Sequence, residues 1–283
     1  MRERVINLLS LGIFQLLGRI FIGLFELIQG IGSRVIFLWR IILALADRPF
    51  EVRELIIQLY LVGVRSLPIV VVSGFFVGGI VALQFNYALS MFKAQVYLGG
   101  VTTSGLLREV GPVLVAIMIT TRIGAFISAE VGTMKVTEQV EAIRCLGLDP
   151  ISTLIVPRFL AVVIMVFLLT ILGLLVSLAG GAIVSNLLLG INFSYYLVNL
   201  KKLTTVWAFL AGTIKSLIFG ILIATIACYE GYFAEEGAQG VGKAVHRTLV
   251  YASIAVFLSD YIVAAIASLT FSLAENIEFI IKT

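Results

Sequence analysis

Residues 130–150, EVGTMKVTEQVEAIRCLGLDP, form a charged segment between two long apolar runs. Three charged residues in it, spaced three apart, are expected to share one face of a short helix: Glu138, Glu141 and Arg144. The apolar residues of that helix are expected to face another way: Val140, Ile143 and Leu146. Gly147 suits the position after a helix, and Asp149 followed by Pro150 prevents continuation. The segment predicts a short helix across a membrane surface, either held by a cytosolic partner or solvated without one.

The composition of the chain is that of a membrane protein. Of its 283 residues, 60% are hydrophobic and 13% are charged, and the mean hydropathy is +1.12. A helix needs about 20 apolar residues to cross a bilayer, and several uncharged runs exceed that length. No basic patch with interleaved aromatic residues occurs, so the pI of about 9.1 does not indicate a nucleic-acid partner. Cys145 and Cys228 have neither metal-ligand nor redox spacing, and no metal site is expected.

The apolar runs predict an all-α integral membrane protein with five transmembrane helices. Their expected bounds are about 66–92, 105–129, 159–185, 203–229 and 248–274. Residues 93–104 are expected to form a short connection, and residues 230–247 a polar, glycine-rich loop. Residues 186–202 are expected to be an external cap or short interfacial helix. The alternative is a tight two-helix hairpin within the uncharged run 159–200. Small residues that allow close helix packing are Gly74 and Gly78, and Gly173, Ser177 and Gly181.

Residues 1–54 form a separate N-terminal segment ahead of the membrane domain, residues 55–283. Charged residues recur there every six to eight positions and return to one helix face: Arg19, Glu26, Arg34, Arg40 and Arg48. One charged stripe on an apolar helix predicts an amphipathic helix lying in the membrane surface. The alternative is an additional transmembrane helix with its charges reaching the interface. Charged residues precede the sequence ALA at 44–46, so no cleaved signal peptide is expected.

The distribution of Lys and Arg predicts the orientation in the membrane. With the N-terminus inside, cytoplasmic segments hold thirteen of these residues and outer segments hold four. The charged segment 130–150 is then cytoplasmic and lies between the second and third spans. An odd number of spans places the C-terminus outside.

Five ionisable residues fall inside the expected spans, where a charge costs about 2.5–3.5 kcal/mol to insert: Arg108, Glu109, Arg122, Lys215 and Asp260. Lys215 and Asp260 are expected at similar depth on different helices, so an ion pair between them would lower both desolvation costs. Such residues either line a cavity that holds a charged headgroup or lock helices together without touching substrate. The position of Arg108 and Glu109 near the outer end of a span favours the cavity, whereas Arg122 favours a structural role.

The residues argue against an enzyme. His246 is the only histidine, which excludes multi-histidine metal sites and leaves a Ser–His scheme with one poorly placed base. Neither a GxSxG elbow nor a Walker-type GxxxxGK(S/T) motif occurs. The glycine-rich stretch 237–243 follows no predicted strand, so it is expected to be a turn at the start of the fifth span.

Several motifs resemble the MlaE/YrbE family of permeases. They are LLREVGPV at 106–113, AEVGTMKVTEQ at 129–139, LDP at 148–150, PRF at 157–159 and SDY at 259–261. They follow in order and cover about residues 55–270. Glu141-Ala142-Ile143 with Gly147 also resembles the E-A-A-x-x-x-G element by which ABC-transporter permeases engage their ATPase.

The resemblance implies the permease subunit of an MCE-associated ABC transporter that moves glycerophospholipids between the inner and outer membranes of Gram-negative bacteria. It implies a homodimer bound by two ATPase subunits that carry ATP and Mg²⁺, so no cofactor is expected in this chain. A hexameric ring of MCE protein is expected on the outer face, often with a STAS-domain protein on the ATPase. Glu109, Lys215 and Asp260 match polar positions near the lipid cavity, and residues 134–149 match the coupling helix.

These features predict a multi-pass permease of the bacterial inner membrane with a cytoplasmic N-terminus and a periplasmic C-terminus. Two other functions are open: an ion-driven secondary transporter that works alone, and a membrane scaffold that transports nothing. The lack of broken-helix repeats disfavours the first of these.

Overall fold

The computed structural model describes residue 25 and residues 28–45, 52–204 and 206–282. The described part is helical and contains no strand, which confirms the predicted all-α fold. After the N-terminal helix come α2 (Val52–Gly63), α3 (Leu67–Met91), α4 (Leu98–Gly105), α5 (Gly111–Ile119), α6 (Ala125–Val136), α7 (Gln139–Cys145), α8 (Val156–Leu187), α9 (Phe193–Leu203), α10 (Val206–Tyr232) and α11 (Gly237–Lys282). Several of these helices run on into one another.

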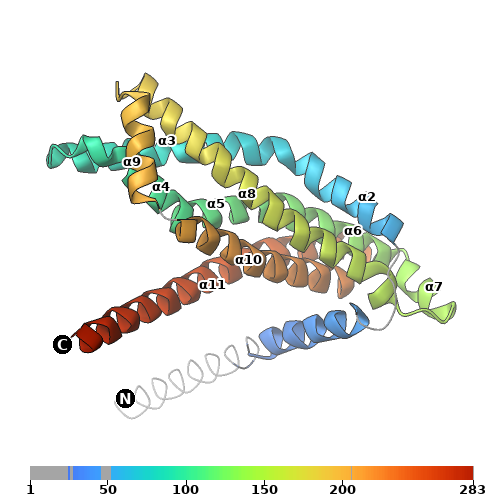
Figure 1. Cartoon of the computed structure of the whole chain (residues 1–283). Coiled ribbons are helices and arrows are strands. Elements are labelled where there is room, and N and C mark those ends of the chain that lie inside the picture. Colours follow the sequence, from blue (N-terminus) through green and yellow to red (C-terminus); the bar gives the residue numbers. More distant parts are fainter. Residues whose placement is uncertain (1–24, 26–27, 46–51, 205, 283) are drawn as a thin grey trace, which may run out of the picture.

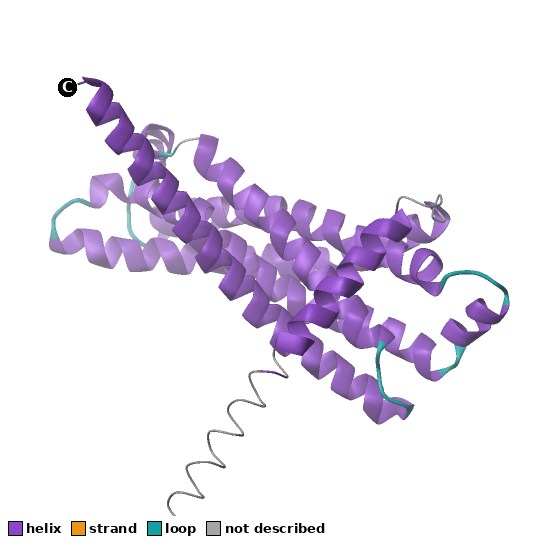
Figure 2. Cartoon of the chain, turned by 90° about the horizontal axis from the view of Figure 1, so that it is seen from below, coloured by secondary structure: helices purple, strands orange, loops and turns teal. Residues whose placement is uncertain are grey.

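Six helical stretches of the described residues are long and apolar enough to cross a membrane: Ile28–Leu45, Val52–Met91, Gln95–Val136, Ile151–Leu187, Trp207–Tyr232 and Gly237–Leu269. The long helices form an elongated bundle in which α8 packs against α3 on one side and α10 on the other (Figure 1). The short helix α7 lies at one end of the bundle and α9 at the opposite end (Figure 1). Helix α11 continues beyond the bundle towards the C-terminus (Figure 2).

The N-terminal helix over Ile28–Leu45 packs one narrow face on the bundle. Phe37 and Ile41 are buried in the main hydrophobic core, whereas Trp39 is 61% exposed. Arg34 and Arg40 of the predicted charged stripe belong to this helix, and the stripe residues Arg19, Glu26 and Arg48 lie outside the described residues. Because the helix also has the length and composition of a span, its interfacial position remains a prediction.

The predicted spans are too short at the end of the bundle where α7 lies. The first was expected from residue 66, but helix runs from Val52 with a short 3-10 turn at Val64–Ser66. The polar residues Glu54 and Gln58 stay helical there because they pair with charged residues of neighbouring helices. The third span likewise begins at Ile151 rather than at 159.

Two predicted loops are mostly helix. The segment 93–104 was expected to be a connection, but Gln95–Gly105 is helical and α4 packs on α9. A Cβ at Gly99 would lie 2.3 Å from the carbonyl oxygen of Tyr196, so only glycine permits this contact. The expected loop 230–247 shrinks to the turn between Tyr232 and Gly237. Its polar residues pair with one another: Glu235 binds Lys243 and Arg247.

The predicted short helix after the third span is confirmed as α9. The side chain of Asn192 caps its start by accepting from the N–H of Ser194. The 11 residues of α9 extend roughly 16 Å, too short to cross a bilayer, so the two-helix hairpin alternative is wrong.

Glycines bring α3 and α8 into close contact. A Cβ at Gly78 would lie 1.8 Å from the carbonyl oxygen of Ser177, and one at Gly74 would lie 3.0 Å from the carbonyl oxygen of Gly173. From the other side, a Cβ at Gly181 would approach the carbonyl oxygen of Gly78 to 3.2 Å. The two sets of small residues therefore meet each other, and the backbones approach as they do in membrane helix pairs.

Candidate functional site

Lys215 on α10 is the centre of an ionic cluster inside the spans. Its side chain is 4% exposed, and its Nζ lies 2.7 Å from Oε2 of Glu109 and 3.0 Å from Oδ1 of Asp260 on α11. The predicted pair between Lys215 and Asp260 is confirmed, and Glu109 adds a second carboxylate. Because the ammonium faces two carboxylates, its removal would leave two negative charges beside each other with no counter-charge.

A break in the helix before α5 creates the third contact of Lys215. Pro112 has no backbone N–H, so the carbonyl of Arg108, four residues earlier, lacks its normal helical donor. The chain forms a π-helical turn over Leu106–Val110, and Lys215 donates to the Arg108 carbonyl oxygen at 3.0 Å. One lysine thus donates to a freed backbone acceptor and to Glu109, and forms an ion pair with Asp260. The π-turn also places Glu109, whose side chain is 50% exposed, at the edge of the cluster.

The other two ionisable residues of the spans do not join this cluster through their side chains. The Arg108 side chain is exposed, and only its backbone carbonyl contacts Lys215. Arg122 lies in a second π-turn, Thr120–Gly124, with its guanidinium 5.9 Å from the Phe126 ring centroid. The structure therefore brings three of the five residues together.

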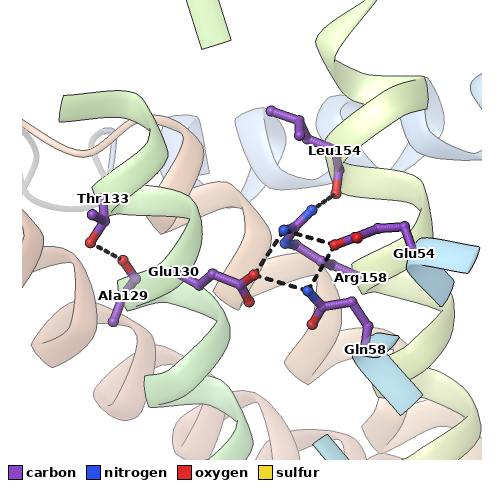
Figure 3. A network of polar contacts seen from close by, with 7 residues as sticks. All are labelled: Glu54, Gln58, Ala129, Glu130, Thr133, Leu154 and Arg158. Carbon is purple, nitrogen blue, oxygen red and sulfur yellow. Dashed lines mark hydrogen bonds and ion pairs between the residues drawn. The ribbon is translucent and has the colours of Figure 1, made fainter. Parts of the chain in front are cut away.

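A second polar cluster, centred on Arg158, joins α2, α6 and α8 (Figure 3). Nη2 of Arg158, at the start of α8, lies 2.8 Å from Oε1 of Glu130 on α6 and 3.1 Å from Oε1 of Glu54 on α2. Nη1 donates to the Leu154 carbonyl oxygen at 2.8 Å. The amide of Gln58 donates to both carboxylates, at 2.9 and 3.1 Å. The Arg158 side chain is 2% exposed, the lowest value among the ion-paired side chains of the described residues.

Sequence reasoning missed this cluster because its members belong to segments expected to face water. Glu130 begins the charged segment 130–150, Arg158 follows that segment, and Glu54 precedes the expected first span. A signal was present: Pro157 and Arg158 open a long uncharged run, and a lone arginine at that position needs a carboxylate partner.

The short helix of the charged segment is present as α7, and its end has the predicted form. Gly147 has φ +77°, and its N–H bonds the Arg144 carbonyl, while the N–H of Leu148 bonds the Ile143 carbonyl. These two bonds form a Schellman motif, the ending that a glycine after a helix favours. Asp149 then caps the next turn by accepting from the N–H groups of Ile151 and Ser152, and Pro150 precedes that turn.

The side chains of α7 are less simply arranged than the spacing predicts. Glu138 precedes the helix with φ +60°, so it does not share a helical face with Glu141 and Arg144. Glu141 pairs with Lys135, which holds the pKa of this carboxyl below its usual value. Arg144 points back to the bundle and donates to the Tyr232 hydroxyl on α10. Of the expected apolar face, Val140 is buried, but Leu146 lies beyond the helix and is 76% exposed.

Helix α7 and the turn between α10 and α11 lie at the same end of the bundle. A hollow there is lined by residues of both segments: Lys135, Val136, Glu138, Glu141, Ala234 and Glu236. The charge pattern had assigned both segments to one membrane face.

A helical bundle of membrane-spanning length, with ionic clusters within it and a short capped helix at one end, defines a polytopic membrane protein of the transporter class. The family described as Permease MlaE matches residues 55–266, and the chain belongs to this family.

Three relatives are similar to most of this chain. A probable ABC transporter permease protein of Rickettsia felis is 36% identical over 235 residues, which cover 83% of this chain and 91% of the relative. The intermembrane phospholipid transport system permease protein MlaE of Haemophilus influenzae is 35% identical over 213 residues, covering 75% and 82%. The chloroplastic protein TRIGALACTOSYLDIACYLGLYCEROL 1 of Arabidopsis thaliana is 30% identical over 226 residues, covering 80% and 65%.

Proposed function

We propose that this chain is the permease subunit of an ABC transporter that moves glycerophospholipid across or out of a bacterial inner membrane. Membership of the MlaE family and the phospholipid-transport relative support the substrate class. The chain itself carries no nucleotide-binding motif, so a separate ATPase subunit, holding ATP and Mg²⁺, drives the cycle.

The form and exposed surface of α7 are the main support for this proposal. This helix ends at the Gly147 turn, lies between α6 and α8 in the chain, and is followed by the exposed Leu146 and Leu148 at its tip. Exposed apolar side chains on a small, well-formed helix suit insertion into a groove of a partner. Glu138 is also exposed there. These residues form the surface that meets the ATPase, and α7 transmits the nucleotide cycle to α6 and α8.

The cluster of Lys215, Glu109 and Asp260 binds the polar headgroup of the lipid. Glu109 is half exposed at the surface of a single chain, so a charged group approaching from a second copy or from lipid can reach it. In a homodimer these carboxylates and the exposed Arg108 side chain line a cavity between the two chains. An MCE-protein ring at the end opposite α7 receives the lipid, and a STAS-domain protein accompanies the ATPase.

The orientation follows from the positive-inside rule together with the ends of the bundle. The segments containing Lys135 and Lys243 meet at the α7 end, whereas Lys201 and Lys202 close α9 at the other end. We place the α7 end and the N-terminus in the cytoplasm and the C-terminus in the periplasm.

Purification from native membranes with mass spectrometry of the intact assembly tests the proposal. We expect two copies of this chain, two copies of an ATPase, an MCE protein and bound glycerophospholipid. A chain that is isolated alone and exchanges lipid for an ion gradient in liposomes would instead indicate a secondary transporter. A companion-bound chain without lipid, whose removal leaves ATP turnover unchanged, would indicate a scaffold.

A further inference from the structure

Helix α7 is joined to α10 by one side-chain hydrogen bond. Nη2 of Arg144 donates to the hydroxyl of Tyr232 at 2.5 Å, and the guanidinium also lies 5.9 Å from the ring centroid. Among the described residues, this is the only side-chain hydrogen bond or ion pair between α7 and a helix other than α6. Movement of α7 therefore acts on the end of α10 most directly at Tyr232.

Tyr232 in turn packs against the N-terminal helix. It is 7% exposed and is the last residue of α10. Its ring centroid lies 5.7 Å from that of Phe37, which is 3% exposed and also lies 5.6 Å from Tyr229 and 6.0 Å from Phe233. Aromatic rings at these distances attract one another beyond their area burial, and such a close-packed cluster moves as a unit.

A second anchor fixes the N-terminal helix to the same end of α10. Arg34 pairs with Glu230, whose side chain is 6% exposed. The guanidinium also lies 5.1 Å from the Tyr229 ring centroid and 4.4 Å from that of Tyr251 on α11. An arginine enclosed by a carboxylate and two aromatic faces is held in one orientation. The N-terminal helix therefore cannot shift along α10 without breaking these contacts.

We propose that Tyr232 is a positioning residue that links α7 to the N-terminal helix, so that the two helices move together with the end of α10. This inference rests on the proposed function, in which α7 receives the nucleotide cycle. The N-terminal helix then becomes a moving part of the transporter, whether it lies in the membrane surface or spans the bilayer. The Tyr232 ring holds Phe37, and its hydroxyl holds Arg144.

The division between ring and hydroxyl allows a sharp test in the assembled complex with its ATPase. Tyr232→Phe removes the bond to Arg144 but keeps the ring that packs on Phe37. The readout is fluorescent phospholipid moved per ATP hydrolysed in proteoliposomes, which a purely structural role would leave unchanged. We expect this ratio to fall by about three- to tenfold, because a hydrogen bond to a charged group carries the link. Tyr251→Phe is the matched control, since Tyr251 also contacts Arg34 but not α7, and its ratio should equal that of the wild type.

Measuring the distance between α7 and the N-terminal helix tests the link independently of transport. Spin labels at the native, exposed Cys145 and at Trp39→Cys, in a Cys228→Ala background with one labelled copy per complex, report the separation of α7 and the N-terminal helix. We expect one distance with and without ATP in the otherwise native chain, and a nucleotide-dependent spread after Tyr232→Phe. A separation that changes with nucleotide in the otherwise native chain, or a lipid-to-ATP ratio unaltered by Tyr232→Phe, would overturn the link. A native complex that moves no lipid would contradict the proposed function instead, while the distances still report on the link.

Discussion

Nη2 of Arg158 lies 2.8 Å from Oε1 of Glu130, and these two residues stand on either side of the segment that carries α7. Their ion pair closes the base of that segment, since Glu130 belongs to α6 and Arg158 to α8 (Figure 3). Glu54 on α2 shares the same guanidinium. A force on α7 therefore reaches three helices at one enclosed point.

Loss of Arg158 should destabilise the protein severely. Arg158→Met leaves Glu54 and Glu130 together without a cation in a site where the arginine was 2% exposed. Breaking such a buried pair typically costs about 3–5 kcal/mol. The midpoint of thermal unfolding in detergent measures the loss. Arg122→Met is the control and should change it little, because Arg122 contacts only the Phe126 ring among the described interactions. Equal midpoints for Arg158→Met and the wild type would contradict this description of the cluster.

Substitution of glycines should lower stability where two helices pack closely and should not do so on open helix surface. Gly78→Ala places a methyl group 1.8 Å from the carbonyl oxygen of Ser177, so α3 and α8 must move apart. We expect a loss of several degrees in the unfolding midpoint. Gly242→Ala meets nothing within 4 Å and should be neutral or stabilising, by about 0.5–1 kcal/mol, because alanine favours helix. The opposite order of the two variants would show that α3 and α8 do not pack as described.

Substitutions in the cluster around Lys215 should distinguish effects on folding from effects on transport. Asp260→Asn keeps the pair of Lys215 with Glu109, so the dimer should remain folded while ATP-driven lipid transfer falls by roughly tenfold, the effect of losing one charged contact. Lys215→Met leaves two unpaired carboxylates and should impair folding as well. Size-exclusion profiles and lipid transfer measured on the same samples distinguish these effects. Full transfer by Asp260→Asn would make the cluster a helix lock only.

Docking of α7 should weaken at low pH through Glu141. The Lys135 ammonium lowers the pKa of this carboxyl from its ordinary value of 4.5. The stabilisation that Glu141 gives is therefore complete above pH 4.5. It is lost as the pH falls through the lower pKa of this carboxyl in the folded protein. Both partners are partly exposed, so the pair contributes less than about 1 kcal/mol and weakens in salt.

Hydrogen exchange of the α7 amides in wild type and Glu141→Gln provides the measurement. The variant should exchange faster near neutral pH, and the difference should vanish at acidic pH. A difference that persists unchanged at a pH where this carboxyl is protonated in the folded protein would assign the protection of α7 to other contacts.

The sequence was sufficient for the membrane class, the all-α fold and the ending of α7. The long uncharged runs and the glycine at position 147 determine structure locally. The charges in the spans carry a strong desolvation cost, which requires partners. Pairing between Lys215 and Asp260 was predictable for that reason, because an isolated charge inside a span is too costly to leave without a partner.

The remaining features depend on which helices meet. Glu54 and Glu130 read as surface charges until Arg158 is placed between them. Arg144 read as a partner-facing residue, but the Tyr232 hydroxyl turns it towards α10. Helix ends were misplaced for the same reason: polar residues such as Glu235 look like loop until their partners Lys243 and Arg247 are known.

We propose that a separate ATPase drives lipid movement through this chain by way of α7. The most direct measurement is the transfer of fluorescent glycerophospholipid in proteoliposomes that contain this chain with its ATPase, compared with the chain alone. We predict transfer that requires ATP and the ATPase and that is lost when Leu146 and Leu148 at the tip of α7 are both changed to Asp. Transfer at the same rate by the chain alone, without ATP, would contradict the account.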